Sequence, residues 1–182
     1  MFRYIFCCLL LLTGYRSFAQ SYFTRDGFIE FTSKTSIETI EAKNHQVLGI
    51  LDLAKHQVAF TVLIKGFLFE KQLMQDHFNE DVMESDQYPK AKFEGSFSST
   101  VNLQASGKQS VPISGNMTIH GITKPISIVA IITPENGKLT TSASFQLKPA
   151  DFNLKVIGVL KNNIAKIIQV TVKAGLQPMA RP

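Results

Sequence analysis

Cysteine is nearly absent from this 182-residue sequence, and the two that occur, Cys7 and Cys8, lie in an apolar run near the first residue. If that run is a cleaved leader, the mature chain has no thiol. A disulfide framework, a thiolate nucleophile and a cysteine-ligated metal site are then excluded. Tryptophan is absent as well, whereas 14 phenylalanines supply apolar bulk without a polar group that needs a partner.

Charge is also limited. Charged residues make up 18% of the chain, and no cluster of Lys or Arg runs along it. The formal net charge of +5 falls to about +3 if Arg3 and Arg16 are removed with the leader. Because nucleic-acid-binding domains usually carry a dense basic patch, we predict no nucleic-acid partner. Weak attraction to anionic lipid head groups stays open.

A long apolar run occurs only at the start of the chain, where residues 1–19 have the pattern of a signal peptide. Arg3 provides a positive charge ahead of the apolar run 5–12, which is too short to span a bilayer. Ser17 and Ala19 are the small residues expected at the third and first positions before a cleavage site.

We therefore predict cleavage before Gln20, a single mature domain over 20–182, and a periplasmic or secreted protein. An uncleaved membrane anchor is the alternative. A lipoprotein anchor would need a cysteine at the end of the apolar run, whereas Cys7 and Cys8 lie near its start. Because no second apolar stretch is long enough to cross a bilayer, we expect no stable membrane insertion after cleavage.

The usual motifs of catalysis and metal binding are missing too. The sequence has no GxSxG elbow, no glycine-rich phosphate loop and no HExxH motif among its four histidines, which are His45, His56, His77 and His120. His77 and Asp81 could share a metal, but we favour a solvated helix face, since two ligands make a poor site. The acidic run 76–86 lacks the spacing of a calcium loop. We predict no catalytic residues, no cofactor and no metal.

Alternation of apolar and polar residues is the dominant pattern that the sequence does contain. It predicts strands clearly at 57–65, 138–147 and 167–174, and more weakly at 28–34, 36–42, 46–52, 91–100, 111–119 and 124–133. Asn136-Gly137 predicts a tight hairpin between two of them. Strands joined by short turns, without helices between them, indicate an antiparallel sheet.

One segment has helical spacing instead. We predict an amphipathic helix over 71–84 that acts as a lid, with apolar positions at Leu73, Met74, Phe78 and Val82. A short turn is expected near 149–152. The elements together predict an all-β fold, an antiparallel lipocalin-like β-barrel of about eight strands with one amphipathic helix (71–84), because closure removes exposed sheet edges. A two-sheet sandwich has the same strand pattern and is the alternative.

The segment TIHGITKP (118–125) forms a compact polar turn between two predicted strands. One interpretation places His120, Thr123 and Lys124 at the barrel mouth, where they would meet a polar head group. The other, which we favour, is a tight corner in which Gly121 supplies backbone freedom and His120 makes a local hydrogen bond.

This turn also carries a family resemblance. The segments ISGNMTIHGITKPISI (113–128), HFNEDVMESDQYPKAKFEGSF (77–97) and DFNLKV (151–156) resemble the YceI-like family, lipocalin-like, polyisoprenoid-binding periplasmic barrels, and the resemblance covers Ser21 to Leu176. It implies an antiparallel barrel whose interior takes a long isoprenoid or a related amphiphile. It also implies a periplasmic or secreted protein, and a class for which no catalytic residues are established.

A ligand of this kind needs an apolar tunnel, since each buried methylene contributes about 0.8 kcal/mol. The more apolar strand faces supply the candidate lining, and the polar turn supplies two candidates for the head group: Phe60, Val62, Ile64, Phe93, Phe97, Met117, Ile119, Ile128 and Phe145, with His120 and Lys124. For each apolar residue, plain core packing is the alternative interpretation.

The resulting hypothesis is an exported lipid-binding protein that transports or stores an isoprenoid-like or other long-chain amphiphile. Leu73, Met74 and Phe78 would close one end of the barrel. Two alternatives stay open: a non-catalytic structural or interaction barrel with a filled core, and a small lipid-processing enzyme. The expected partner is an apolar or amphiphilic lipid, and a homodimer is possible.

Overall fold

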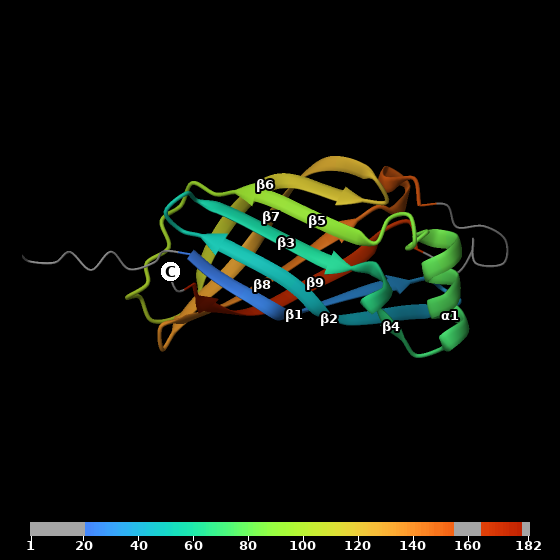
Figure 1. Cartoon of the computed structure of the whole chain (residues 1–182), viewed down its shortest axis with the longest axis horizontal. Coiled ribbons are helices and arrows are strands. Elements are labelled where there is room, and N and C mark those ends of the chain that lie inside the picture. The colour runs from blue at the N-terminus through green and yellow to red at the C-terminus, as the bar shows by residue number, and fades with distance from the viewer. Residues whose placement is uncertain (1–20, 155–164, 180–182) are drawn as a thin grey trace, which may run out of the picture.

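A closed antiparallel barrel is the architecture of the computed structural model, which describes residues 21–154 and 165–179. Eight long strands form it: β1 (Ser21–Lys34), β2 (Thr39–Asp52), β3 (Gln57–Leu63), β5 (Lys90–Ser96), β6 (Gln109–Ile119), β7 (Ile122–Glu135), β8 (Lys138–Leu147) and β9 (Ile168–Pro178). The sheet closes because β1 pairs with both β2 and β9 (Figure 1). The predicted fold class is confirmed, and closure rules out the two-sheet sandwich.

The strand boundaries differ from the prediction mainly at β1 and β2. β1 begins at Ser21, seven residues before the predicted strand 28–34. Two strands, 36–42 and 46–52, were expected in place of β2, which is a single strand whose pairing with β1 shifts register near Asn44 and Val47. The polar residues between the two predicted strands look like a turn, yet Asn44 is fully buried. Its side-chain amide donates to the carbonyl of Leu63 at 2.8 Å and accepts from the backbone N–H of Gln46 at 2.6 Å. A buried polar residue with satisfied hydrogen bonds can therefore continue a strand.

The predicted helix over 71–84 is shorter and less regular than expected. An α-helix, α1 (Gln72–His77), continues into a π-helical turn, η2 (Phe78–Val82). The wider turn shows in the hydrogen bond from the N–H of Met83 to the carbonyl of Phe78, 2.9 Å long. Such turns reorient side chains along a helix. Two 3₁₀ turns, η1 (Ile64–Gly66) and η3 (Pro149–Phe152), complete the helical elements of the described chain, the second as predicted.

The two ends of the barrel differ. One end is closed by the β2–β3 turn, by the loop 97–108 between β5 and β6, and by the predicted Asn136-Gly137 hairpin, whose two residues both have positive φ. The other end, on the right of Figure 1, carries η1, the two-residue strand β4 (Leu68–Phe69), α1 and η2. We call these the hairpin end and the helix end. Within the described residues, no helix is long and apolar enough to cross a bilayer.

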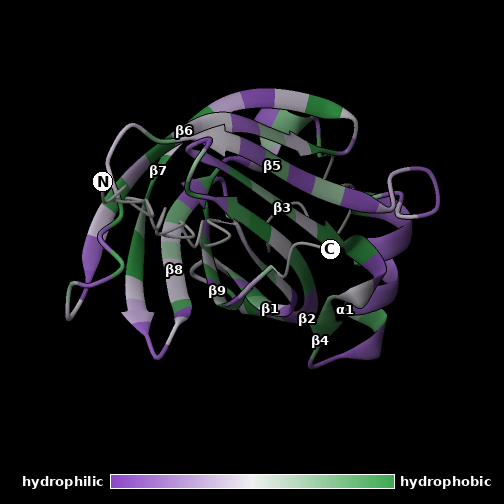
Figure 2. Cartoon of the chain, turned by 60° about the vertical axis from the view of Figure 1, so that its left-hand side comes forward, coloured by the Kyte–Doolittle hydropathy of each residue, from purple (hydrophilic) through white to green (hydrophobic). Residues whose placement is uncertain are grey.

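Alternation of side chains defines the inside of the barrel. Figure 2 shows apolar and polar residues alternating along the strands, as expected when one face is buried and the other wet. The hairpin end contains a packed core that includes Phe97, Val101 and Val111. Towards the helix end the interior is less completely filled.

We predict that Gly115→Ala destabilises the barrel. A Cβ at position 115 would lie 2.3 Å from the carbonyl oxygen of Glu94 and 2.5 Å from the Cα of Gly95, so β5 and β6 would have to separate. We expect the free energy of unfolding to fall by about 1–3 kcal/mol, measured by urea denaturation. Gly175→Ala is the matched control, because a Cβ there meets nothing within 4 Å. The control should be neutral or stabilising by about 0.4–1 kcal/mol, and equal losses in both variants would contradict the close-approach argument.

Candidate functional site

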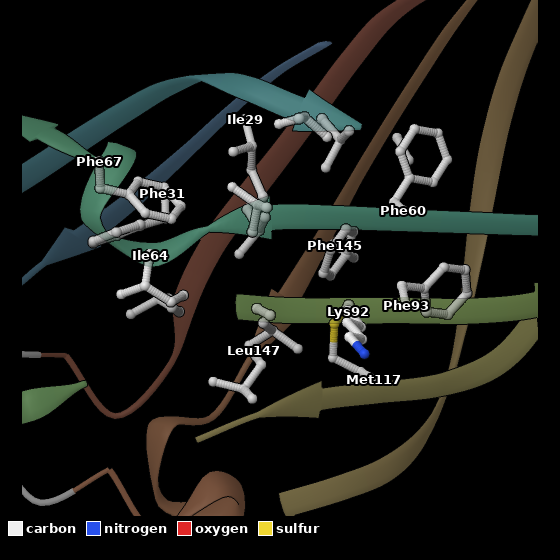
Figure 3. A pocket seen from close by; sticks show the side chains of 18 of the residues that line it. Ile29, Phe31, Phe60, Ile64, Phe67, Lys92, Phe93, Met117, Phe145 and Leu147 are labelled. Carbon is white, nitrogen blue, oxygen red and sulfur yellow. The ribbon is translucent and has the colours of Figure 1, made fainter. Parts of the chain in front are cut away.

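An internal cavity extends through the barrel from the helix end to Leu51, Val58 and Leu176, near the hairpin end (Figure 3). Its volume is about 220 Å³, counted as space open to the centre of a water molecule. A single bound water needs roughly 10–15 Å³ of such space, so this cavity has room for a guest far larger than water. All nine strands contribute to its wall, together with η1, α1, η2 and η3.

The strand register arranges the inward aromatic side chains in rows. Phe60 of β3 pairs with Phe93 of β5, and Phe93 pairs with Met117 of β6. Across the barrel, Phe31 of β1 and Phe145 of β8 both pair with Val170 of β9. Because directly paired residues point to the same face, each row presents a continuous apolar surface to the cavity.

Few polar groups interrupt this wall. Lys92 belongs to it, but Lys92 is exposed and alternates with the inward-facing Phe93. His77 of α1 lies at the rim, about two-fifths exposed, with its Nδ1 2.7 Å from Asp81 Oδ2. Ser33 is buried, and its hydroxyl accepts a hydrogen bond of 2.8 Å from the N–H of Ala165. The cavity therefore suits an apolar chain that requires no hydrogen bonds.

Four phenylalanine rings close the helix end of the cavity. Phe31, Phe67, Phe69 and Phe78 come from β1, the residue after η1, β4 and η2, and all four line the cavity. Phe78 lies 5.6 Å from Phe31, 5.7 Å from Phe67 and 5.0 Å from Phe69, measured between ring centroids. These are ordinary separations for packed aromatic rings. Phe67 and Phe69 were not among the predicted lining residues, although the Phe-Leu-Phe alternation from 67 to 69 carried the signal.

The structure places most of the predicted lining residues at the cavity. Eight line it: Phe60, Val62, Ile64, Phe93, Met117, Ile119, Ile128 and Phe145. Phe97 lies elsewhere, buried in the core at the hairpin end, because β5 runs away from the cavity as it approaches that end. Of the three lid residues, Met74 and Phe78 line the cavity. Leu73 does not, since its side chain is 66% exposed on the outer side of α1.

The two head-group candidates, His120 and Lys124, do not line the cavity. Lys124 pairs with Met117 across β6 and β7, yet its side chain is exposed. His120 and Gly121 form the tight β6–β7 turn with positive φ at both residues. The ring of His120 packs on Tyr88 with 4.4 Å between centroids, and its Nε2 lies 2.6 Å from Glu84 Oε2. The geometry therefore matches the structural interpretation, a corner that fastens the residues after η2 to the barrel.

Among the described residues that line the cavity, the ionisable ones are His77 and Lys92. Across 21–154 and 165–179 there is no group of three or more His, Cys, Asp and Glu side chains that could hold a metal ion. His77 and Asp81 form a pair on the half-exposed face of the helix, as the solvated-face interpretation predicts. What the arrangement offers is enclosure of apolar surface.

Residues 23–176 match the YceI-like domain, which confirms the resemblance drawn from the sequence segments. Among solved structures, a polyisoprenoid-binding domain from Saccharophagus degradans implicated in plant cell wall breakdown has a TM-score of 0.75 at 14% identity, covering 88% of this chain and 99% of that one. Burkholderia cenocepacia BcnA gives 0.69 at 16% identity, covering 82% and 95%. The Campylobacter jejuni YCEI protein gives 0.59 at 16% identity, covering 100% of both. Among curated proteins, none matches this sequence.

The fastening role of His120 predicts a loss of stability without a loss of ligand affinity. His120→Ala should lower the free energy of unfolding by about 1–3 kcal/mol, because it removes a hydrogen bond to a carboxylate and leaves the Tyr88 ring exposed. A double-mutant cycle with Glu84→Ala, followed by thermal and urea denaturation, should give a coupling energy of about 0.5–1.5 kcal/mol.

The affinity of the His120→Ala variant for a fluorescent apolar probe, N-phenyl-1-naphthylamine, should stay within about twofold of wild type. A loss of about 1.4 kcal/mol in binding free energy would instead lower the affinity tenfold. Lys124→Ala in the same hairpin serves as the control, because the Lys124 side chain is exposed and does not line the cavity; it should change neither quantity. A large loss of probe affinity in the His120 variant would instead assign this residue to the ligand.

Proposed function

Because the chain belongs to the YceI-like family, we propose that it binds an isoprenoid-like or other long-chain amphiphile inside the barrel. The observation that supports this most directly is the cavity, whose wall is apolar on every strand. A polyisoprenoid is also what the Saccharophagus degradans domain of the same fold is named for binding. The ligand gains its affinity from transfer of apolar area out of water, at about 0.8 kcal/mol per methylene.

The position of the polar residues orients such a ligand. The hairpin end is closed by buried apolar side chains such as Phe97 and Val111, so a charged group there would be buried without a partner. At the opposite end of the cavity, His77 of α1 lies at the rim and Ser33 of β1 is buried. The apolar chain therefore enters tail first, past Phe60, Phe93 and Met117, and a polar head stays near α1.

Two rival functions fit the cavity less well. An interaction barrel would have an interior filled by its own side chains, whereas this interior has unfilled space at the helix end. A lipid-processing enzyme would need polar groups positioned against the guest, and the cavity wall formed by the described residues is nearly all apolar. Binding without chemistry accounts for both features.

The proposal also includes export of the protein and transport or storage of the bound lipid. Residues 1–19 read as a cleaved leader and lie outside the described residues, so the protein would act in the periplasm or after secretion. There it would shield a poorly soluble lipid during transport or storage. The homodimer remains a prediction, since a single chain does not test it.

The decisive experiment is native mass spectrometry of the protein purified from its own host. We expect adducts whose masses match an isoprenoid or another long-chain amphiphile, confirmed by extraction and fragmentation. Protein that is free of ligand, and that also fails to bind polyprenols and fatty acids at micromolar concentration, would refute the proposal.

A cavity-filling substitution tests the position of the ligand. Ala143→Phe on β8 adds an aromatic ring to a residue that lines the cavity, and it should weaken binding of a long prenyl alcohol at least tenfold by displacing its chain. Ser144→Phe is the matched control, because Ser144 is the exposed neighbour on the same strand. Affinities come from displacement of N-phenyl-1-naphthylamine, and circular dichroism verifies that both variants fold. Equal affinities in the two variants would place the ligand outside the barrel.

A further inference from the structure

The loops of the barrel expose large apolar side chains at one end only. Ile37 between β1 and β2, Leu68 of β4 and Leu73 of α1 are 68%, 59% and 66% exposed, the three highest values among the exposed large apolar residues of the described chain. All three lie at the helix end, shown on the right of Figure 1. None of the other exposed large apolar residues in the described part belongs to the turns of the hairpin end.

The neighbouring residues explain why Leu68 and Leu73 point outward. Met74 of α1 and Phe78 of η2 line the cavity, and Leu73 is exposed on the far side of α1. In β4, Phe69 joins the aromatic closure, so Leu68 points the other way by alternation. These three apolar residues neither pack in the core nor line the cavity. Several exposed apolar residues at one end of a protein indicate an interaction surface.

The lysines beside these residues are paired with carboxylates. Lys71, two residues before Leu73, has its Nζ 3.1 Å from Oε1 of Glu38, the residue after Ile37. Lys43, which pairs with Leu68 across β2 and β4, has Glu41 within 3.9 Å. These two lysines therefore do not form a basic patch for anionic lipids. What the helix end offers is apolar insertion, which zwitterionic lipid head groups permit.

We propose that the helix end docks on a lipid bilayer by inserting Ile37, Leu68 and Leu73 into its interfacial region, and that this places the cavity rim at the membrane. The inference rests on the proposed function, because it is the lipid cavity behind α1 and β4 that makes a bilayer the fitting occupant. A guest with a long apolar chain would then pass between membrane and barrel without crossing bulk water.

Co-sedimentation with phosphatidylcholine vesicles tests the docking, using the full mature chain. Wild type should bind, and binding should persist at high salt and change little when phosphatidylserine is added, since apolar insertion is not screened. The triple variant Ile37→Ser, Leu68→Ser, Leu73→Ser should bind at least tenfold more weakly. Because all three residues are already exposed, this variant should fold normally.

A second triple variant is the matched control. Leu48→Ser, Ile50→Ser and Val129→Ser remove apolar residues that are 50%, 48% and 51% exposed on the outer wall of β2 and β7, in the halves of these strands that lead to the hairpin end. This variant should bind vesicles like wild type. Failure of wild type to sediment with vesicles, or equal losses in the two triples, would overturn the docking proposal.

Two further readouts separate docking from its rivals and from the proposed function. N-phenyl-1-naphthylamine, delivered in solution without vesicles, should bind both triples with wild-type affinity. If wild type fails to bind this probe in solution yet still binds vesicles, the cavity proposal fails while docking stands. If analytical ultracentrifugation shows self-association without vesicles that the helix-end triple abolishes, a second copy covers this end and the docking proposal is wrong.

Discussion

Everything at the cavity depends on the antiparallel pairing that keeps two-residue alternation in phase around a closed sheet. Each strand alone has an apolar face, but a slip of one residue at any pairing would turn that face to solvent. The pairing of β1 with both β2 and β9 fixes the register at the place where the sheet would otherwise have two free edges. Phe60, Phe93 and Met117 are aligned only because their strands pair in that register.

The two ends of the barrel interior differ in how completely side chains fill them. At the hairpin end, buried residues such as Phe97 and Val111 pack closely, and this packing contributes hydrophobic stability to the fold. Towards the helix end the same alternation continues, but the side chains leave a cavity between them. Phe31, Phe67, Phe69 and Phe78 close the end of this cavity. A cavity of this kind lacks the van der Waals contacts of a packed core, and a bound guest can supply those contacts.

The segment between β3 and β5 supplies apolar side chains to both the inside and the outside of the helix end. It provides Phe67, Phe69 and Phe78 to the inside and Leu68 and Leu73 to the outside. The hydrogen bond between His120 and Glu84 fastens its last part to the β6–β7 turn. One short stretch of chain thus faces the proposed guest on one side and the proposed membrane on the other, while the barrel wall remains a rigid support.

The sequence by itself determined the strands, the β8 boundaries, the hairpin at Asn136-Gly137 and eight of the cavity-lining residues, because alternation with period two and turn chemistry are local properties. Tertiary structure decided the rest. Asn44 continues β2 because a carbonyl of β3 is there to accept its hydrogen bond, and Phe97 leaves the cavity because the hairpin end is filled. His120 meets Glu84, 36 residues away. Leu73 faces solvent because Met74 of α1 and Phe78 of η2 take the side that faces the cavity. Contacts of that kind join segments distant along the chain, and no local pattern encodes them.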